Sequence, residues 1–441
     1  MAGSHSFNAR RLCFWMVLVA LAVRLAVVPF LLPEQLNPEH DHWRFGYEAC
    51  RIARSIVEGR GFGNPLFANT GPTAWQTPVY PYLVAGVFKV FGIYSTASAV
   101  ALLLLNALTS ALTCLPIFFF ARESFGARVG LWSGWAWAFF PYAIYFPEER
   151  IWDTWLATLL LCILFLIILR FEKKPYGTWS WIGYGAVWGV AALTDPIVLS
   201  ALVPLGLWLC WRLHKQRRHW FTPNLIAALV FAAVVSPWFV RNYRVFHHFI
   251  PFRDNMGLEL HVGYNGDTSH WFPRMAGPWH NEAEWQEYMQ RGEYAYMADK
   301  KREALAYITA RPAFFIWVSF RHAVYLWTGY WSFNRTYLQE ENMDPENIPF
   351  CTAVTILTLA GLWLAFRRER AAALPYFLVL LFFPLLYYVT HPEDWYRRPI
   401  DPFFVVLAVY VIASWRPPAP QPLDQGLPSV AGQSGKTFDG K

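Results

Sequence analysis

Two acidic residues stand where polar sequence meets apolar sequence. Asp41 follows the apolar run 12–32 by nine residues, and Asp153 lies near the start of the apolar run 151–170. A carboxylate within about 3 Å of a hydroxyl group can accept its proton as that oxygen attacks, which is general-base chemistry. The sequence therefore predicts catalytic roles for both residues. The alternatives are a helix cap for Asp41 and a favourable place in a helix dipole for Asp153.

Two adjacent arginines, Arg397 and Arg398, precede the last apolar run, 399–415. A guanidinium group grips phosphate through two parallel N–H···O bonds, so the pair is a candidate phosphate site at a membrane surface. The alternative is that both side chains anchor the run at the lipid headgroups. A second set of arginines follows the seventh apolar run: Arg241, Arg244 and Arg253.

Other polar residues near these positions are further candidates for the site: Glu39, His40, His42, Tyr47, Glu148, Glu149 and His261. His40 and His42, with the neighbouring carboxylates, could hold a divalent metal ion, but solvated histidines are the favoured interpretation. Cofactors and metal dependence therefore stay open. Glu148 is the second choice for the site role given to Asp153, and its alternative is a surface charge. His261 is a weaker candidate for a metal or phosphate contact.

Composition and motifs exclude several classes of protein. The 441 residues are 56% hydrophobic and only 15% charged, far from a soluble globular average. The net charge of +7 comes from Lys and Arg clustered between apolar runs, which argues against nucleic-acid binding. The sequence contains no GxxxxGK[ST] loop, CxxC pair or HExxH helix, so nucleotide hydrolysis and zinc proteolysis lack support.

The elements that must position the candidate residues are membrane spans. A helix needs about 20 apolar residues to cross the hydrocarbon core, and ten runs approach that length. They are residues 12–32, 97–120, 129–146, 151–170, 179–193, 196–212, 222–240, 350–366, 372–390 and 399–415. The predicted fold class is an all-α polytopic membrane protein of ten spans, or eleven if the run 312–331 also crosses.

The short loops predict the orientation. With the N-terminus inside, fifteen Lys and Arg residues fall on the cytoplasmic side and three on the short outer loops, as the positive-inside rule requires. A crossing by residues 312–331 would invert the spans that follow. That run is therefore interpreted as an interfacial helix with Arg321 and His322 at the headgroups.

One membrane domain, residues 1–415, follows from this topology, with a disordered cytoplasmic tail at 416–441. Two large segments lie on the outer side, 33–96 and 241–349, and function is expected there because long connections in a compact chain are usually functional. Within these segments the sequence predicts an amphipathic helix at 45–58, a re-entrant or interfacial stretch at 78–92 and a helix at 281–310.

Several motifs in this order resemble the GT-C glycosyltransferases, in particular the branch of protein O-mannosyltransferases and aminoarabinose transferases. The resemblance rests on an acidic residue after the first span, the juxtamembrane helix bearing Tyr47 and five short motifs. These are Gly-Arg-Gly-Phe at 59–62, Pro-Val-Tyr-Pro-Tyr at 78–82, Phe-Gly at 91–92, Ile-Trp-Asp-Thr-Trp-Leu at 151–156 and Tyr-Arg-Arg-Pro-Ile-Asp-Pro at 396–402. The first 170 residues match well and the middle segment poorly.

The resemblance implies an inverting enzyme that moves a sugar from a polyprenyl-phosphate donor to a lipid, glycan or protein acceptor. It implies that Asp41 is the general base, that Asp153 is the family's acidic residue at the outer start of a span, and that Arg397 and Arg398 bind the donor phosphate. The expected location is a bacterial inner membrane, with the active site on the outer, periplasmic face. The alternative is a secondary transporter or flippase-like protein of envelope glycolipids, although the sequence shows no inverted repeat.

Overall fold

The computed structural model describes residues 9–36, 45–266, 276–330, 347–393 and 395–415. The regular elements among these residues are helices, and the only β-type pairing between them is an isolated bridge between Gly63 and Pro72. Four candidate site residues lie outside the described residues: Glu39, His40, Asp41 and His42. The predicted tail, 416–441, also lies outside them.

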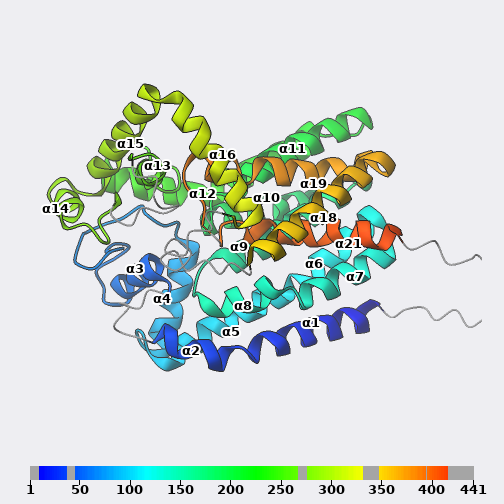
Figure 1. Cartoon of the computed structure of the whole chain (residues 1–441), viewed down its shortest axis with the longest axis horizontal. Helices are drawn as coiled ribbons and strands as arrows, with labels where there is room; N and C mark the ends of the chain where they lie inside the picture. Colours follow the sequence, from blue (N-terminus) through cyan, green and yellow to red (C-terminus); the bar gives the residue numbers. More distant parts are fainter. Residues whose placement is uncertain (1–8, 37–44, 267–275, 331–346, 394, 416–441) are drawn as a thin grey trace, which may run out of the picture.

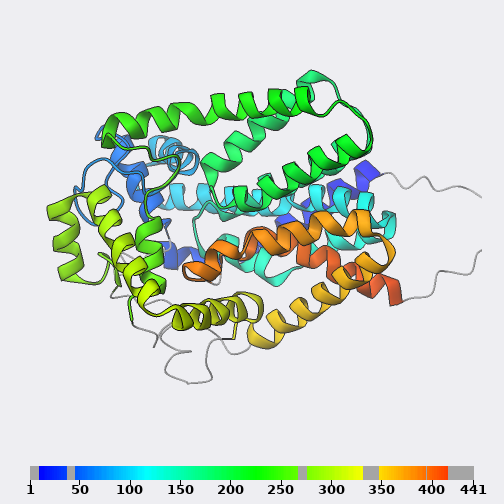
Figure 2. The ribbon, with the colours of Figure 1, turned by 90° about the horizontal axis from the view of Figure 1, so that it is seen from above.

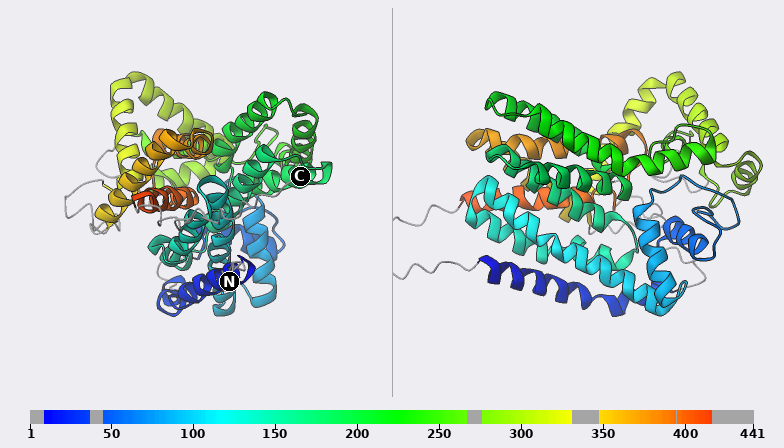
Figure 3. Two further views of the ribbon diagram at one scale, coloured as in Figure 1. Left: turned by 90° about the vertical axis from the view of Figure 1, so that its right-hand side faces the viewer. Right: turned by 180° about the vertical axis from the view of Figure 1, so that it is seen from behind.

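Long helices and a few short ones form a bundle (Figures 1 and 2). They are α1 (Ala9–Leu25), α2 (Val28–Gln35), α5 (Thr96–Leu112), α6 (Cys114–Phe125), α7 (Ala127–Ala138), α8 (Pro141–Glu149), α9 (Thr154–Lys173), α10 (Thr178–Thr194), α11 (Val198–Lys215), α12 (Phe221–Phe246), α18 (Asn347–Arg368), α19 (Arg370–Phe382), α20 (Leu385–Val389) and α21 (Asp401–Trp415). Helix α1 begins and α21 ends at the same end of this bundle (Figure 3).

The remaining helices gather at or lead to the opposite end (Figure 1). They are α3 (Tyr47–Val57), α4 (Val79–Phe91), α13 (Met256–Gly263), α14 (Glu282–Arg291), α15 (Glu293–Ala310), α16 (Pro312–Thr328) and the 3-10 helix η3 (Arg398–Ile400). The described parts of the two long outer segments therefore lie at one end of the molecule, as the predicted topology requires.

Each of the ten predicted spans is helical, and among the described residues seven helical stretches are long and apolar enough to cross a membrane. The other three predicted spans correspond to α7 with α8, α10, and α11. The first of these is interrupted before Pro141, and the other two form the hairpin expected around Asp195 and Pro196. The chain is an integral membrane protein of the predicted all-α class. Helix α16 is not among the seven stretches, and its place at the interface stays a prediction.

A buried arginine holds the interruption between α7 and α8. The last carbonyl groups of a helix have no partner within it, and a buried helix end must find donors elsewhere. Arg24 of α1 donates to the carbonyl oxygens of Trp137 at 3.3 Å and Ala138 at 3.2 Å, and its Nε donates to Ser110 Oγ at 2.8 Å. A charged residue in the first span is therefore part of the bundle's internal bonding.

Small residues bring helices into backbone contact. A Cβ atom built on Gly185 of α10 would lie 2.3 Å from the carbonyl oxygen of Ala227 in α12, and one on Gly361 of α18 would lie 2.1 Å from that of Leu407 in α21. Helices in membranes associate through such close packing because lipid offers no hydrophobic gain for bringing them together.

The outer segments partly follow the prediction. The helix expected at 45–58 is α3, but the single helix expected at 281–310 is divided into α14 and α15 at Gly292, whose φ of +76° ends one helix and begins the next. The expectation for His322 is wrong. Its side chain is buried, with Nδ1 3.1 Å from the carbonyl oxygen of Tyr388, because α16 packs against α20 at this residue.

Candidate active site

The start of α3 is pressed against the start of α9. Gly46, the residue before α3, has a φ of +75°, and a Cβ atom there would lie 2.7 Å from the carbonyl oxygen of Ile151. Only glycine combines this backbone conformation with so close an approach. The start of α3 therefore contacts Ile151, which is two residues before Asp153 in the chain.

Four carboxylates surround one arginine at this end of the bundle. Arg253 interacts electrostatically with Asp195, Asp153, Glu259 and Glu48, and its Nε donates to the carbonyl oxygen of Trp75 at 2.8 Å. We call Glu48, Asp153, Asp195, Arg253 and Glu259 the carboxylate cluster. Its members come from five separate parts of the chain, and most of them are partly rather than fully buried.

Two members of the cluster stand at helix starts. Asp153 directly precedes α9 and is 5% exposed, with no hydrogen bond from its side chain to the helix N-terminus. The apolar run begins at residue 151, but the regular helix begins only at Thr154, so Asp153 precedes the helix. Asp195 separates α10 from α11, and its Oδ1 accepts from the Ile197 N–H at 3.3 Å.

Helix α13 brings the fourth carboxylate into place. Two of its glycines permit this: a Cβ on Gly257 would lie 2.0 Å from the Met297 oxygen, and one on Gly263 would lie 1.9 Å from the Thr390 oxygen. The carboxylate of Glu259 then lies 3.4 Å from His391 Nδ1.

His391 extends the cluster to a phenol group. Its Nε2 lies 3.4 Å from the hydroxyl of Tyr396. Burial lowers the pKa of His391 to about 4, so the ring is neutral at pH 7. The neutral imidazole can donate from one nitrogen and accept at the other, which joins Glu259 to Tyr396 by hydrogen bonding.

Two acids of the cluster have pKa values near neutral. Burial raises the pKa of Glu48 to about 7 and that of Glu259 to about 7, while Arg253 acts in the opposite direction on both. Burial also raises the pKa of Asp153 and of Asp195. One guanidinium cannot neutralise four carboxylates in such surroundings. Strongly shifted acids gathered in one place are typical of catalytic acid–base sites.

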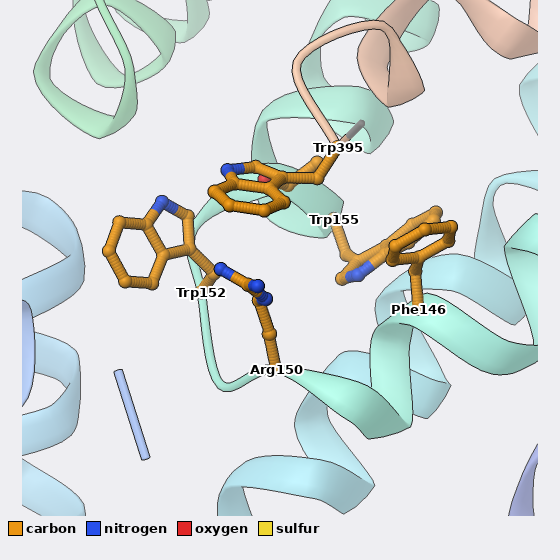
Figure 4. A pocket seen from close by; sticks show the side chains of 6 residues that line it. Phe146, Arg150, Trp152, Trp155 and Trp395 are labelled. Carbon is orange, nitrogen blue, oxygen red and sulfur yellow. The ribbon is translucent and has the colours of Figure 1, made fainter. Parts of the chain in front are cut away.

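An aromatic pocket adjoins the cluster (Figure 4). We call it the Trp pocket; it is lined by Phe146, Arg150, Trp152, Thr154, Trp155 and Trp395. The Arg150 guanidinium lies 3.6 Å from the centroid of the Trp395 ring. Arg150 also interacts electrostatically with Glu48, which connects the pocket to the cluster.

Arg397 and Arg398 bond to the same carboxylate. Arg397 Nε donates to Asp401 Oδ1 and Arg398 Nη1 to Asp401 Oδ2, each at 2.9 Å, and all three residues are buried. Arg397 Nη1 also donates to the carbonyl oxygen of Trp327 at 3.1 Å. The Arg398 guanidinium stacks 4.5 Å from the centroid of the Phe146 ring, so it stands behind one wall of the Trp pocket.

The other predicted site residues are dispersed. Glu148 is fully buried near Arg24, and burial raises its pKa to about 8. The surface-charge alternative for Glu148 is therefore wrong. The carbonyl oxygen of Glu149 accepts from Gln35 Nε2 at 2.7 Å.

Tyr47 and His261 have different neighbours. The Arg51 guanidinium stacks on the Tyr47 ring, 4.8 Å from its centroid. His261 Nδ1 lies 3.6 Å from Glu303 Oε2. Within the described ranges no group of three or more His, Cys, Asp or Glu residues is arranged to hold a metal ion. Residues 39–42, where the sequence leaves metal binding open, lie outside these ranges.

Sequence reasoning gave no role in the site to four residues of this region: Glu48, Arg150, Asp195 and Glu259. The predicted topology indicates that these four residues lie at the same membrane surface. When spans alternate in direction, residues 48, 150, 195 and 259 all fall on the same side of the membrane as Asp153.

Residues 75–240 match the sequence model of the dolichyl-phosphate-mannose-protein mannosyltransferase family. No curated protein matches the sequence. The matched region includes α9 with Asp153, the Asp195 hairpin and most of the Trp pocket.

Solved structures share the fold at low sequence identity. The oligosaccharyltransferase AglB from Archaeoglobus fulgidus, in complex with an inhibitory peptide and a dolichol-phosphate, is 12% identical, and the match covers 93% of this chain and 51% of AglB, with a TM-score of 0.54. The same enzyme tethered to an acceptor peptide containing the NVT sequon is 13% identical, with 91% and 50% covered and a TM-score of 0.52. This chain thus spans about half the length of these enzymes.

ArnT from Cupriavidus metallidurans, bound to undecaprenyl phosphate, is 15% identical over 90% of this chain and 76% of ArnT, but its TM-score of 0.40 is too low to add to the argument. The arrangement of the bundle and the match of residues 75–240 lead to one conclusion. The chain has the GT-C glycosyltransferase fold, and its residues 75–240 are similar to the protein O-mannosyltransferases.

Proposed function

We propose that this protein is an inverting glycosyltransferase that moves a sugar from a polyprenyl-phosphate donor to a lipid, glycan or protein acceptor on the outer face of the membrane. The observation that carries the proposal is the carboxylate cluster, where acids with pKa values near neutral meet at one end of a GT-C bundle. Such groups can take a proton from an acceptor hydroxyl at physiological pH.

The chemistry assigns Asp41 and Asp153 to the reacting centre. The acceptor oxygen attacks C1 of the sugar, the bond from C1 to the phosphate oxygen breaks, and the phosphate leaves with the electron pair. Asp41 takes the proton of the acceptor hydroxyl. Gly46, five residues after Asp41 in the chain, contacts Ile151, which is two residues before Asp153.

The leaving group requires positive charge rather than a proton, because a phosphate is already a weak base. AglB, which shares this fold, binds a dolichol-phosphate, and this supports a lipid-linked phosphate as the donor group. Arg397 and Arg398 stay candidates for binding it, although each is bonded to Asp401. A divalent metal ion near residues 39–42 also stays a prediction.

The proposed outer location rests on charge. The basic loops between α6 and α7, α9 and α10, α11 and α12, and α18 and α19 lie at the end of the bundle where α1 begins, whereas the cluster lies at the other end. Basic loops face the cytoplasm in most membrane proteins. We expect outside labelling to reach a cysteine introduced at Gly71 but not one introduced at Lys215.

The test of the function is a transfer assay with the purified full-length chain in detergent. Synthetic polyprenyl-phosphate sugars are supplied with envelope lipids, glycans and peptides as acceptors. We expect free polyprenyl phosphate to appear in step with a glycosylated product whose anomeric configuration is inverted. Movement of glycolipid across proteoliposomes without any glycosylated product would instead establish the transporter alternative.

A further inference from the structure

The two long outer segments are bonded to each other through residues 73–75. The Ala74 N–H donates to Glu293 Oε1 at 2.6 Å, and Thr73 Oγ1 donates to Glu293 Oε2 at 2.6 Å. In the other direction, the carbonyl oxygen of Ala74 accepts from the Asp254 N–H at 3.2 Å. Glu293 and Asp254 belong to the second outer segment, so two of its acidic residues bond to the same short stretch of the first.

Arg253 is fixed by the same stretch. Its Nε donates to the carbonyl oxygen of Trp75 at 2.8 Å, and Arg241 Nη1 donates to that of Thr73 at 2.6 Å. Arg253 is also the cation of the carboxylate cluster. The position of this cation therefore depends on how residues 73–75 are bonded.

Asp254 and Glu293 form a pair of adjacent carboxyl groups with unequal surroundings. Glu293 is 5% exposed, and three donors reach its two oxygens: those of Thr73 and Ala74, and the Tyr288 hydroxyl at 3.0 Å. The Asp254 carboxyl oxygens are also buried, but no N–H or hydroxyl group of the described residues donates to them. Their neighbour within hydrogen-bonding reach is the Glu293 carboxylate, which is itself an acceptor.

A proton on Asp254 would give this pair the donor that it lacks. Burial and the neighbouring Glu293 both raise the pKa of Asp254, because two adjacent anions repel each other strongly in buried surroundings. Arg253 acts in the opposite direction, but more weakly. The other titratable groups that face the pair are Arg241 and Tyr288. The Arg241 guanidinium is bonded to backbone oxygens, and the Tyr288 phenol is neutral because burial raises its pKa.

We propose that Asp254 holds a proton and donates it in a hydrogen bond to the Glu293 carboxylate, and that this bond keeps Arg253 in place within the carboxylate cluster. Asp254 and Glu293 are then positioning residues, because they act on the site through residues 73–75 and Arg253. When the proton leaves, two adjacent anions repel each other and the contact between the outer segments loosens. The proton site does not depend on the proposed glycosyltransferase function, but its effect on turnover rests on that function.

Paired amide variants of the full-length protein in detergent test the proton site. In Asp254→Asn an amide N–H replaces the proton, so we expect an unfolding midpoint close to that of wild type. In Glu293→Gln an NH2 group replaces an accepting oxygen and leaves a buried donor without its acceptor, so we expect a clearly lower midpoint. Glu282→Gln, at an exposed acid in the same outer segment, is the control and should stay close to wild type.

The pH dependence of stability separates a proton site from an ordinary structural contact. The folded protein holds the Asp254 proton above the reference value of 3.8 for the free side chain, so the free energy of unfolding falls as pH rises beyond that value. Asp254→Asn carries no such proton and should show a shallower decline than wild type, whereas Glu282→Gln should keep the wild-type slope. The infrared band of protonated carboxyl groups should also be weaker in Asp254→Asn, at a pH at which free aspartate is ionised.

Turnover tests the positioning role. Loss of the proton should lower the kcat of wild type at high pH. Asp254→Asn cannot lose it and should keep its kcat to a higher pH, with the KM for the donor unchanged.

The proton site is overturned if Asp254→Asn unfolds at a lower midpoint than Glu293→Gln, because Asp254 would then act as an anion beside Arg253. It is also overturned if Asp254→Asn keeps the wild-type slope and infrared band. The positioning role is overturned if the kcat of Asp254→Asn falls at the same pH as that of wild type. A weaker infrared band in Asp254→Asn, with no sugar transfer by wild type, would leave the proton site standing and contradict the proposed glycosyltransferase activity instead.

Discussion

Two groups of charges at the end of the bundle opposite the start of α1 differ in the ratio of cations to carboxylates. The arginine pair places two cations on Asp401, with all three side chains nearly excluded from water and the donors of Arg397 shared with backbone oxygens. The carboxylate cluster places four acids around Arg253 and leaves most of them partly accessible. Oxygen Oε2 of Glu48 is buried with no hydrogen-bond partner among the described residues.

This difference suggests different tasks. A buried ion pair whose members satisfy each other holds elements together, and removal of one member costs much stability. An excess of acids around one cation costs stability in the folded protein and persists where it serves a reaction. The arginine pair is therefore expected to be structural and the cluster catalytic. The following experiments can separate the two.

The largest effect is expected at the catalytic carboxylates. Asp41→Asn and Asp153→Asn should each lower kcat, because an amide cannot accept a proton, and loss of a general base typically costs about 10²- to 10⁴-fold. The measurement is sugar transfer by the purified variants, together with their unfolding midpoints. Asparagine is a good helix cap, so wild-type turnover by folded Asp41→Asn would leave only the capping role for Asp41.

Asp401→Asn should lower the stability of the protein rather than the rate of the reaction. It leaves two buried guanidinium groups without their carboxylate, and breaking a buried ion pair costs about 3–5 kcal/mol of stability. We expect a large drop in the free energy of unfolding in detergent and an unchanged KM for the donor in the molecules that remain folded. Normal stability with a raised donor KM would mean that the arginine pair serves the substrate.

A glycine pair tests how the cluster is assembled. Gly46 and Gly59 have φ values of +75° and +77°, but only a Cβ at Gly46 would meet other atoms, whereas nothing lies within 4 Å of one at Gly59. Both alanine variants bear the left-handed strain of roughly 1–2 kcal/mol. Gly46→Ala should lose about 1–3 kcal/mol more through crowding, and should also lose activity. Equal behaviour of the two variants would contradict the contact between α3 and Ile151.

The smallest expected effect is on the pH dependence of stability. The folded protein holds the Glu48 proton up to a pKa of about 7, whereas the reference value of the free side chain is 4.5. The folded state therefore binds more protons between these values, and the free energy of unfolding should fall as pH rises through this window. We expect Glu48→Gln to flatten the decline in unfolding midpoint. Glu58→Gln, at the more exposed end of the same helix, is the control, and equal slopes for both variants would rule out the effect.

Much of the architecture is readable along the chain. Runs of about 20 apolar residues between basic loops predict helices and their alternation, and Asp195 followed by Pro196 predicts the hairpin of α10 and α11. The burial of His322 is not readable in this way, because it depends on the packing of α16 against α20, a segment distant in sequence.

The candidate site also has features that are local in the sequence and features that depend on the tertiary structure. The sequence by itself determined that Asp153 stands at the start of a span, because the length of an apolar run is a local property. Only the tertiary structure decided that Glu48, Asp195 and Glu259 surround Arg253, and that Arg397 and Arg398 share Asp401. Which helix ends become neighbours depends on packing between spans, including backbone contacts at Gly46, Gly257 and Gly263 that no periodicity of the chain encodes.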